Sequence, residues 1–231
     1  MSKLFINIIS RASLSFLVLT LAFTAVEPAV SFGASVQSQF TISQQVSAEV
    51  AFATLASNVS MSPTLGGITG GTANGQTQVV VTTNDLLGYN MTIQASSTGA
   101  MQGTASTTNF IPVYSTTTPD FTFVTPANTA RFGYTVGASS TSDVTPLFKS
   151  NGSSLCGVGG TTANNTNTYS ALRCWIGATS TAVTIINRNL PTQAPGATTT
   201  LYFQVGIAAN PVPAIPNDTY IATSTLTATA N

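Results

Sequence analysis

Apolar and polar residues alternate along much of this chain with a period of two, which is typical of half-buried β-strands. The clearest example is Gln76–Ser96, which reads as two strands joined by a short turn at Asn84-Asp85 and Gly88. We predict a hairpin here, and we expect the rest of the chain to supply strands that cover its apolar face. The predicted buried face consists of Thr77, Val79, Val81, Thr83, Tyr89, Met91, Ile93 and Ala95.

The same alternation predicts further strands. A long one covers Val36–Phe52, where most apolar residues occupy even positions and a bulge near Gln44 could interrupt the strand. Another covers Thr219–Ala230. Asp218-Thr219-Tyr220 at its start resembles the Asp-x-Tyr element of a tyrosine corner, in which the tyrosine hydroxyl ties the strand to a preceding loop. The alternative is that Tyr220 simply packs at the edge of the core. The remaining candidates are Arg131–Val136, Ala182–Ile186 and Thr200–Ala208.

The mature chain shows no amphipathic helical pattern, and Pro and Gly recur between the short apolar runs. We therefore predict an all-β protein, an antiparallel, Ig-like β-sandwich of about nine strands. Residues 36–231 would form a single domain, and residues 97–175 a loop-rich elaboration of it.

The first 35 residues predict a secretory signal peptide with a signal helix. Lys3 and Arg11 are followed by an apolar run, Leu14–Val26, of 13 residues and then by small residues. The run is shorter than the about 20 residues that span a bilayer, so we expect no stable membrane span after cleavage; an uncleaved anchor is the alternative. Cleavage is expected after Ser31, Ala34 or Ser35, with the last two favoured, and the protein would be secreted or held at the cell surface.

Two cysteines, Cys156 and Cys174, flank a loop with little apolar content. In a secreted chain an even number of cysteines favours a disulfide. A metal or redox pair is the rival interpretation, but the spacing is far from CxxC and no histidine could complete a metal site. The sequence thus predicts an irregular insertion stapled by a disulfide, with no metal and no cofactor.

Charged residues make up 5% of the chain, against about 25% in ordinary soluble domains. The formal net charge is zero, so no basic surface is available for nucleic acid. The absence of histidine rules out a Ser-His-Asp or Cys-His arrangement, and the few carboxylates are widely spaced. We expect no enzymatic activity, and we expect low charge to permit association between copies.

The stapled loop contains candidate ligand-binding residues. Trp175 and Tyr169 are aromatic platforms for a sugar ring, and Asn165 carries an amide that could hydrogen-bond sugar hydroxyls. Packing of Trp175 in the core is the competing interpretation. A carbohydrate-binding module that recognises surface glycans through the Tyr169–Trp175 loop is therefore the alternative function.

The succession TNDLLGYNMTIQAS, RFGYTV, the two-cysteine loop ending in CW, TTTLYFQVGI and NDTYIATSTLTATAN resembles uncharacterised secreted proteins of ultra-small candidate-phylum bacteria. In general layout it also resembles WxL-type surface domains, although Ile176-Gly177 after Trp175 departs from the WxL signature. The resemblance implies an extracellular or cell-surface β-sandwich and no activity.

The leading functional expectation is a non-catalytic structural or adhesive protein whose partners are its own copies or other surface proteins. Its terminal strands carry few charges, and charge and proline are the usual protection of strand edges against pairing. We expect the first strand, from Val36, to be the element exchanged between copies. The competing outcome is that both terminal strands pair within one closed sandwich, which would give a monomer.

Overall fold

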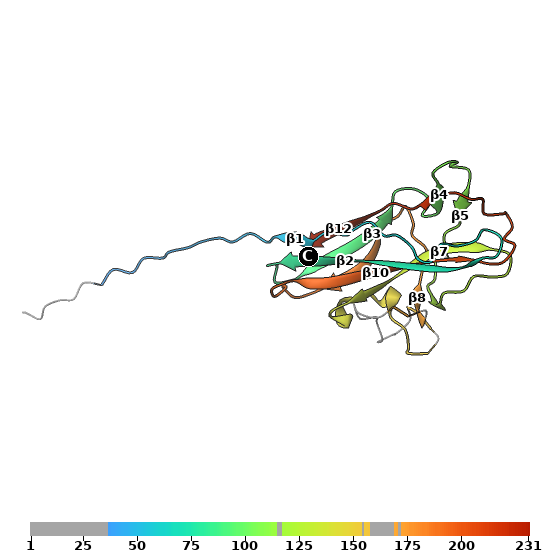
Figure 1. The fold of residues 1–231 in the computed structure, drawn as a ribbon. Helices are drawn as coiled ribbons and strands as arrows, with labels where there is room; N and C mark the ends of the chain where they lie inside the picture. The colour runs from blue at the N-terminus through green and yellow to red at the C-terminus, as the bar shows by residue number, and fades with distance from the viewer. Residues whose placement is uncertain (1–36, 115–116, 154, 158–168, 171) are drawn as a thin grey trace, which may run out of the picture. The chain divides into compact units, whose positions relative to one another are not determined.

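The computed structural model describes residues 37–114, 117–153, 155–157, 169–170 and 172–231. The predicted signal peptide and its cleavage positions lie outside these residues. Val46–Asn231 form one compact unit that is built of antiparallel sheets, as expected from the alternating pattern (Figure 1). Within the described ranges no helix has the length and apolarity needed to cross a bilayer.

The described residues form twelve strands and two single-turn 3-10 helices, η1 and η2. In chain order these are β1 (Val50–Thr54), β2 (Gly71–Thr83), β3 (Tyr89–Ala95), β4 (Met101–Gly103), β5 (Phe110–Ile111), β6 (Asp120–Thr122), β7 (Ala130–Ala138), η1 (Thr141–Asp143), η2 (Pro146–Phe148), β8 (Leu172–Trp175), β9 (Val183–Arg188), β10 (Ala197–Ile207), β11 (Tyr220–Ile221) and β12 (Ser224–Ala230).

Two sheets carry most of the structure. The first has the order β1-β2-β10-β7, and the second has the order β12-β3-β9. Two smaller sheets, β11-β4-β5 and β6-β8, complete the described part. β1 and β12 are therefore edge strands of different sheets, and they lie next to each other (Figure 1).

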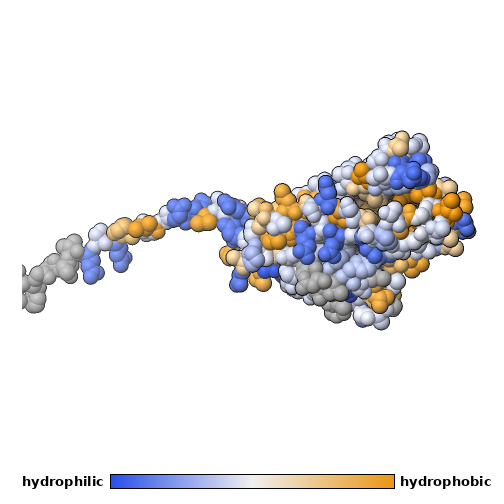
Figure 2. Space-filling model, in the orientation of Figure 1, coloured by the Kyte–Doolittle hydropathy of each residue, from blue (hydrophilic) through white to orange (hydrophobic). Residues whose placement is uncertain are grey.

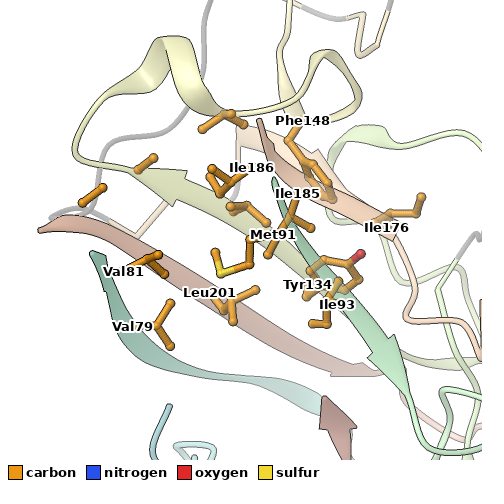
Figure 3. Close-up of a cluster of buried hydrophobic side chains, with 14 of the residues drawn as sticks. Val79, Val81, Met91, Ile93, Tyr134, Phe148, Ile176, Ile185, Ile186 and Leu201 are labelled. Carbon is orange, nitrogen blue, oxygen red and sulfur yellow. The ribbon is translucent and has the colours of Figure 1, made fainter. Parts of the chain in front are cut away.

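The main core draws its side chains from both large sheets (Figure 3). Val79 and Val81 come from β2 and Leu201 from β10, while Met91 comes from β3 and Ile185 from β9. All five are at most 1% exposed. This packing explains why β2 and β3 alternate so clearly, because each presents one face to the same core.

The predicted hairpin is wrong, although both of its strands and its buried face are present. β2 pairs with β1 and β10, whereas β3 pairs with β12 and β9, so the connection at 84–88 crosses from one sheet to the other. Alternation tells which face of a strand is buried, but it does not tell which strand is the neighbour. Two strands of different sheets that share a core give the same pattern as a hairpin.

The long strand predicted over Val36–Phe52 is also wrong for most of its length. Residues 37–49 contain no strand, and pairing begins at Val50. Phe40, Ile42 and Val46 are 81%, 84% and 77% exposed. An alternating pattern produces a strand only where another strand offers its main chain, so alternation alone does not make residues 37–49 a strand.

The closing strand predicted over Thr219–Ala230 is two strands, β11 paired with β4 and β12 paired with β3. The Tyr220 hydroxyl donates to the Pro216 carbonyl at 2.9 Å, which confirms the predicted link between this strand and the preceding loop. Residues 97–175 are more than an elaboration, because β7 pairs with β10 along nine residues in the first sheet.

Candidate functional site

The disulfide is present as predicted. Cys156 and Cys174 are joined, with their Cα atoms 5.7 Å apart, and Cys174 lies buried in β8. At the other end of the disulfide, Cys156 forms an isolated β-bridge with Ser150, which lies in the segment after η2. Since both ends are held, the bridge staples the loop to the folded unit, and this is a structural task.

Trp175 is not available as a sugar-stacking platform, because its side chain is fully buried. It packs with Tyr114, Phe123 and Tyr202, and the Phe123 ring meets it edge-on at 5.3 Å. Tyr169 lies against this cluster, half-buried, and its hydroxyl donates to the Gln204 side chain. Asn165 lies outside the described residues. The core interpretation of Trp175 therefore holds.

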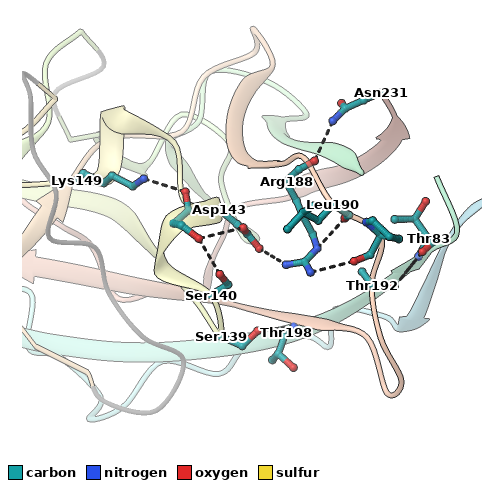
Figure 4. A network of polar contacts seen from close by, with 12 residues as sticks. Thr83, Ser139, Ser140, Asp143, Lys149, Arg188, Leu190, Thr192, Thr198 and Asn231 are labelled. Carbon is teal, nitrogen blue, oxygen red and sulfur yellow. Dashed lines mark hydrogen bonds and ion pairs between the residues drawn. The ribbon is translucent and has the colours of Figure 1, made fainter. Parts of the chain in front are cut away.

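A polar network ties loops together beside β12 (Figure 4). Arg188 Nη1 donates to Asp143 at 2.6 Å, while Nε and Nη2 donate to the carbonyls of Leu190 and Pro191. Asn231 Nδ2 donates to the Arg188 carbonyl at 2.9 Å. Every arginine nitrogen in this network is used to hold backbone or its ion-pair partner, which indicates a clamp and not a reaction centre.

The sequence does not single out this clamp, since Asp143 and Arg188 are 45 residues apart. The scarcity of charged residues was the only feature of the sequence that could have drawn attention to Asp143 and Arg188. Nearby Tyr89 is fully buried, and burial raises its pKa to about 12, so the phenol stays protonated at neutral pH.

The hollows in the described part of the surface are lined mainly by uncharged residues. A hollow of about 540 Å³ is lined mainly by Pro112, Val113, Val212 and Pro213, together with Arg131, whose guanidinium lies 5.3 Å from the centre of the Tyr114 ring. Among the described residues no three His, Cys, Asp or Glu side chains lie close enough to hold a metal ion.

The edge of β12 offers main-chain hydrogen-bonding groups. Ser96 N donates to Thr223 O and Asn231 N donates to Gly88 O, so the odd-numbered residues of β12 bond to β3. In an antiparallel pair the intervening residues point their N–H and C=O groups the other way. Those of Leu226 and Ala228 therefore face away from β3, toward the free edge.

The side chains along this edge are apolar and only half-covered. Leu226 and Ala228 of β12 and Val50 and Phe52 of β1 all pack against the main core while remaining partly exposed. We call the strip between β1 and β12 that these four residues line the seam. Neither strand contains a charged residue or a proline, so the seam lacks the usual protection against an added strand.

The segment before β1 has complementary properties. Residues 37–46 carry exposed apolar side chains at alternate positions and no charge. Their neighbours Ser47 and Glu49 are hydrogen-bonded to Asn84, whose Nδ2 donates to the Ser47 carbonyl and whose Oδ1 accepts from Glu49 N–H. The hydrogen-bonded part of the chain thus begins at Ser47, directly after the exposed segment 37–46.

Most of the surface in Figure 2 is pale, between strongly polar and strongly apolar, as expected for a surface rich in Thr and Ser.

This arrangement of sheets, clamp and exposed edges defines an all-β chain with a candidate strand-binding surface and no recognisable reaction centre in the part that the structure describes. The chain matches no protein-family model, no curated protein and no solved structure. The resemblance to WxL-type surface domains and to secreted candidate-phylum proteins stays a prediction.

Proposed function

We propose that this protein is a secreted, non-catalytic structural or adhesive component of a cell surface, and that its copies associate by strand pairing. The observation that carries the proposal is segment 37–46, whose exposed apolar residues alternate without a strand partner. Leaving several large apolar side chains in water is unfavourable by roughly 1.5–3 kcal/mol each relative to burial. Pairing with another chain would remove that cost.

The finer fold belongs to the same proposal. We infer that the sheets β1-β2-β10-β7 and β12-β3-β9 stack as an Ig-like β-sandwich, which is supported by the shared core of Figure 3. An extracellular setting is supported by the disulfide, since such bonds persist in oxidising compartments. The apolar run near the start of the sequence supports export.

The non-catalytic part of the proposal rests on the absence of histidine from the whole sequence and on the use of Arg188 and Asp143 as a structural clamp. The glycan-binding alternative loses its main support because Trp175 is buried. We therefore favour assembly as the function.

The test is the oligomeric state of the exported protein, measured by sedimentation over a range of concentrations, with and without Val36–Gln45. We expect concentration-dependent oligomers for the complete chain and monomers for the deletion variant, and filaments or a surface layer on cells in electron micrographs. If the complete chain stays monomeric at high concentration and cells carry no such structures, assembly is not its function.

A further inference from the structure

The main core is incompletely covered along the seam. Its lining residues Val50, Phe52, Leu226 and Ala228 contact the core yet remain half-exposed. By contrast, Val79 and Val81 of β2 and Met91 of β3 are 0% exposed. In the first sheet β2 has strands on both sides, and in the second β3 has strands on both sides. Four of the seven partly buried residues that pack on this core therefore belong to β1 and β12, two edge strands that come next to each other; the other three are Leu147, Val183 and Phe203.

One more strand would hydrogen-bond the main-chain groups on the free edge of β12. The N–H and C=O groups of Leu226 and Ala228 point toward the free side of β12, and an added strand could pair with them without disturbing the ladder to β3. Its inward side chains would need to be apolar to complete the cover over the core, and its outward ones polar. Strand addition of this kind combines main-chain bonding with pockets for alternate side chains.

Segment 37–46 has this pattern and the right length. Ten residues in an extended chain span roughly 34 Å, and the 7 residues of β12 span roughly 24 Å, so the segment is long enough to lie along the whole of β12. Phe40, Ile42 and Val46 would point inward, with the polar Gln44 on the same face between the last two, and no charge on either strand opposes their approach.

We propose, on the basis of the assembly function above, that the seam is the acceptor site and that segment 37–46 of a second copy occupies it as an added strand beside β12. Each copy would give its segment to one neighbour and receive a segment from another. Because the giving and receiving surfaces differ, the contact is heterologous and propagates as a chain of subunits.

The first test uses the full mature chain with Ala228→Pro. This substitution removes an N–H that faces the free edge, and proline is tolerated at such positions. We expect Ala228→Pro to leave the melting temperature nearly unchanged and to abolish the oligomers. Thr227→Pro is the matched control, because its N–H bonds to β3, and it should lower the melting temperature instead.

The second test does not depend on how well Ala228→Pro folds. A photo-reactive phenylalanine analogue replaces Ile42, which is exposed and therefore tolerant, in a mixture of isotopically heavy and light copies. We expect cross-links between heavy and light copies that map to residues 50–54 or 220–230. Cross-links to other surfaces, or only within one copy, would overturn the proposal.

The two proposals fail in different ways. If deletion of Val36–Gln45 abolishes assembly while a folded Ala228→Pro variant assembles normally, the segment mediates assembly but the seam is not its acceptor. If the unaltered protein never assembles, the proposed function itself is wrong.

Discussion

Segment 37–46 and strand β12 have nearly the same sequence character and opposite structural outcomes. Both alternate apolar residues with Ser, Thr or Gln, and neither contains a charge or a proline. β12 is paired with β3 along its whole length, and its inward residues are half-buried. Segment 37–46 has no strand structure and is exposed throughout.

The difference lies in what surrounds each segment. β12 is held by β3 on one side, by Asn231 at its end and by the Tyr220 hydroxyl bond at the loop before it. In the described part of the chain, the segment before β1 is anchored at its end, where Asn84 bonds Ser47 and Glu49 and the Thr83 hydroxyl donates to the Glu49 carbonyl. A segment with alternating apolar residues can form a strand, but it does so only when another strand is available to pair with it.

The largest effect should come from removing the neighbour of β12. Met91 is fully buried in β3, directly opposite Ala228, and Met91→Asp would place an unpaired charge in the core at a cost above about 4 kcal/mol. We expect loss of soluble, folded protein, measured by yield and circular dichroism. Thr92→Asp, on the other face of the same strand, should fold; equal damage from both would contradict the face assignment.

A second variant separates the stability of the folded unit from the behaviour of segment 37–46. Replacing Cys156 and Cys174 together by Ser should lower the free energy of unfolding by about 3 kcal/mol, because the bridge closes a loop of 18 residues. Urea unfolding measures the loss. While the variant remains folded, its assembly should match that of the parent; weakened assembly would mean that the stapled loop takes part in the contact.

The sequence predicted the buried faces of β2 and β3, the all-β class and the disulfide, because periodicity and cysteine pairing depend on local pattern and compartment. It did not predict that β2 and β3 belong to different sheets. Most of their partner strands lie far away in the sequence, and the alternation within β2 and β3 does not indicate which strands these are. Nor did it settle Trp175, whose burial depends on Phe123 and Tyr202 from distant segments.

The candidate site was half-predicted for the same reason. The alternation of apolar residues before β1 was visible in the sequence, and the exchange of this segment between copies stays a proposal. The seam was not visible, because it arises only when β1 and β12, at opposite ends of the chain, lie next to each other. The Arg188–Asp143 clamp likewise depends on tertiary contacts between η1 and the end of β9.

A smaller effect compares the two segments directly. Leu226→Ala removes half-buried apolar surface from β12 and should cost about 1 kcal/mol of unfolding free energy in the dilute monomer. Ile42→Ala in segment 37–46 should leave the stability of the monomer unchanged, since Ile42 contributes no buried surface there. Chemical denaturation at low protein concentration measures both. A clear loss with Ile42→Ala would show that the segment already packs within its own chain.

The smallest effect concerns Asp218, which fixes the loop that leads into β11 and β12. Its carboxylate accepts hydrogen bonds from Ala105 N–H, Thr219 N–H and the Thr104 hydroxyl, and these bonds, led by that of Ala105, hold its pKa below its ordinary value of 3.8. A carboxyl whose pKa is lower in the folded state stabilises the fold fully above its ordinary pKa, and this contribution disappears as the pH falls through the lowered value. The stability advantage of the parent over Asp218→Asn should therefore be constant above about pH 5 and shrink steadily at lower pH.

Because the Asp218 side chain is exposed to solvent, this stability advantage should be small, and it should diminish in high salt. Urea unfolding of the two proteins at matched pH values measures the difference, which cancels the titration of the other carboxylates. An advantage that grows as the pH falls would mean that the hydrogen bonds to Asp218 do not hold the loop before β11 and β12.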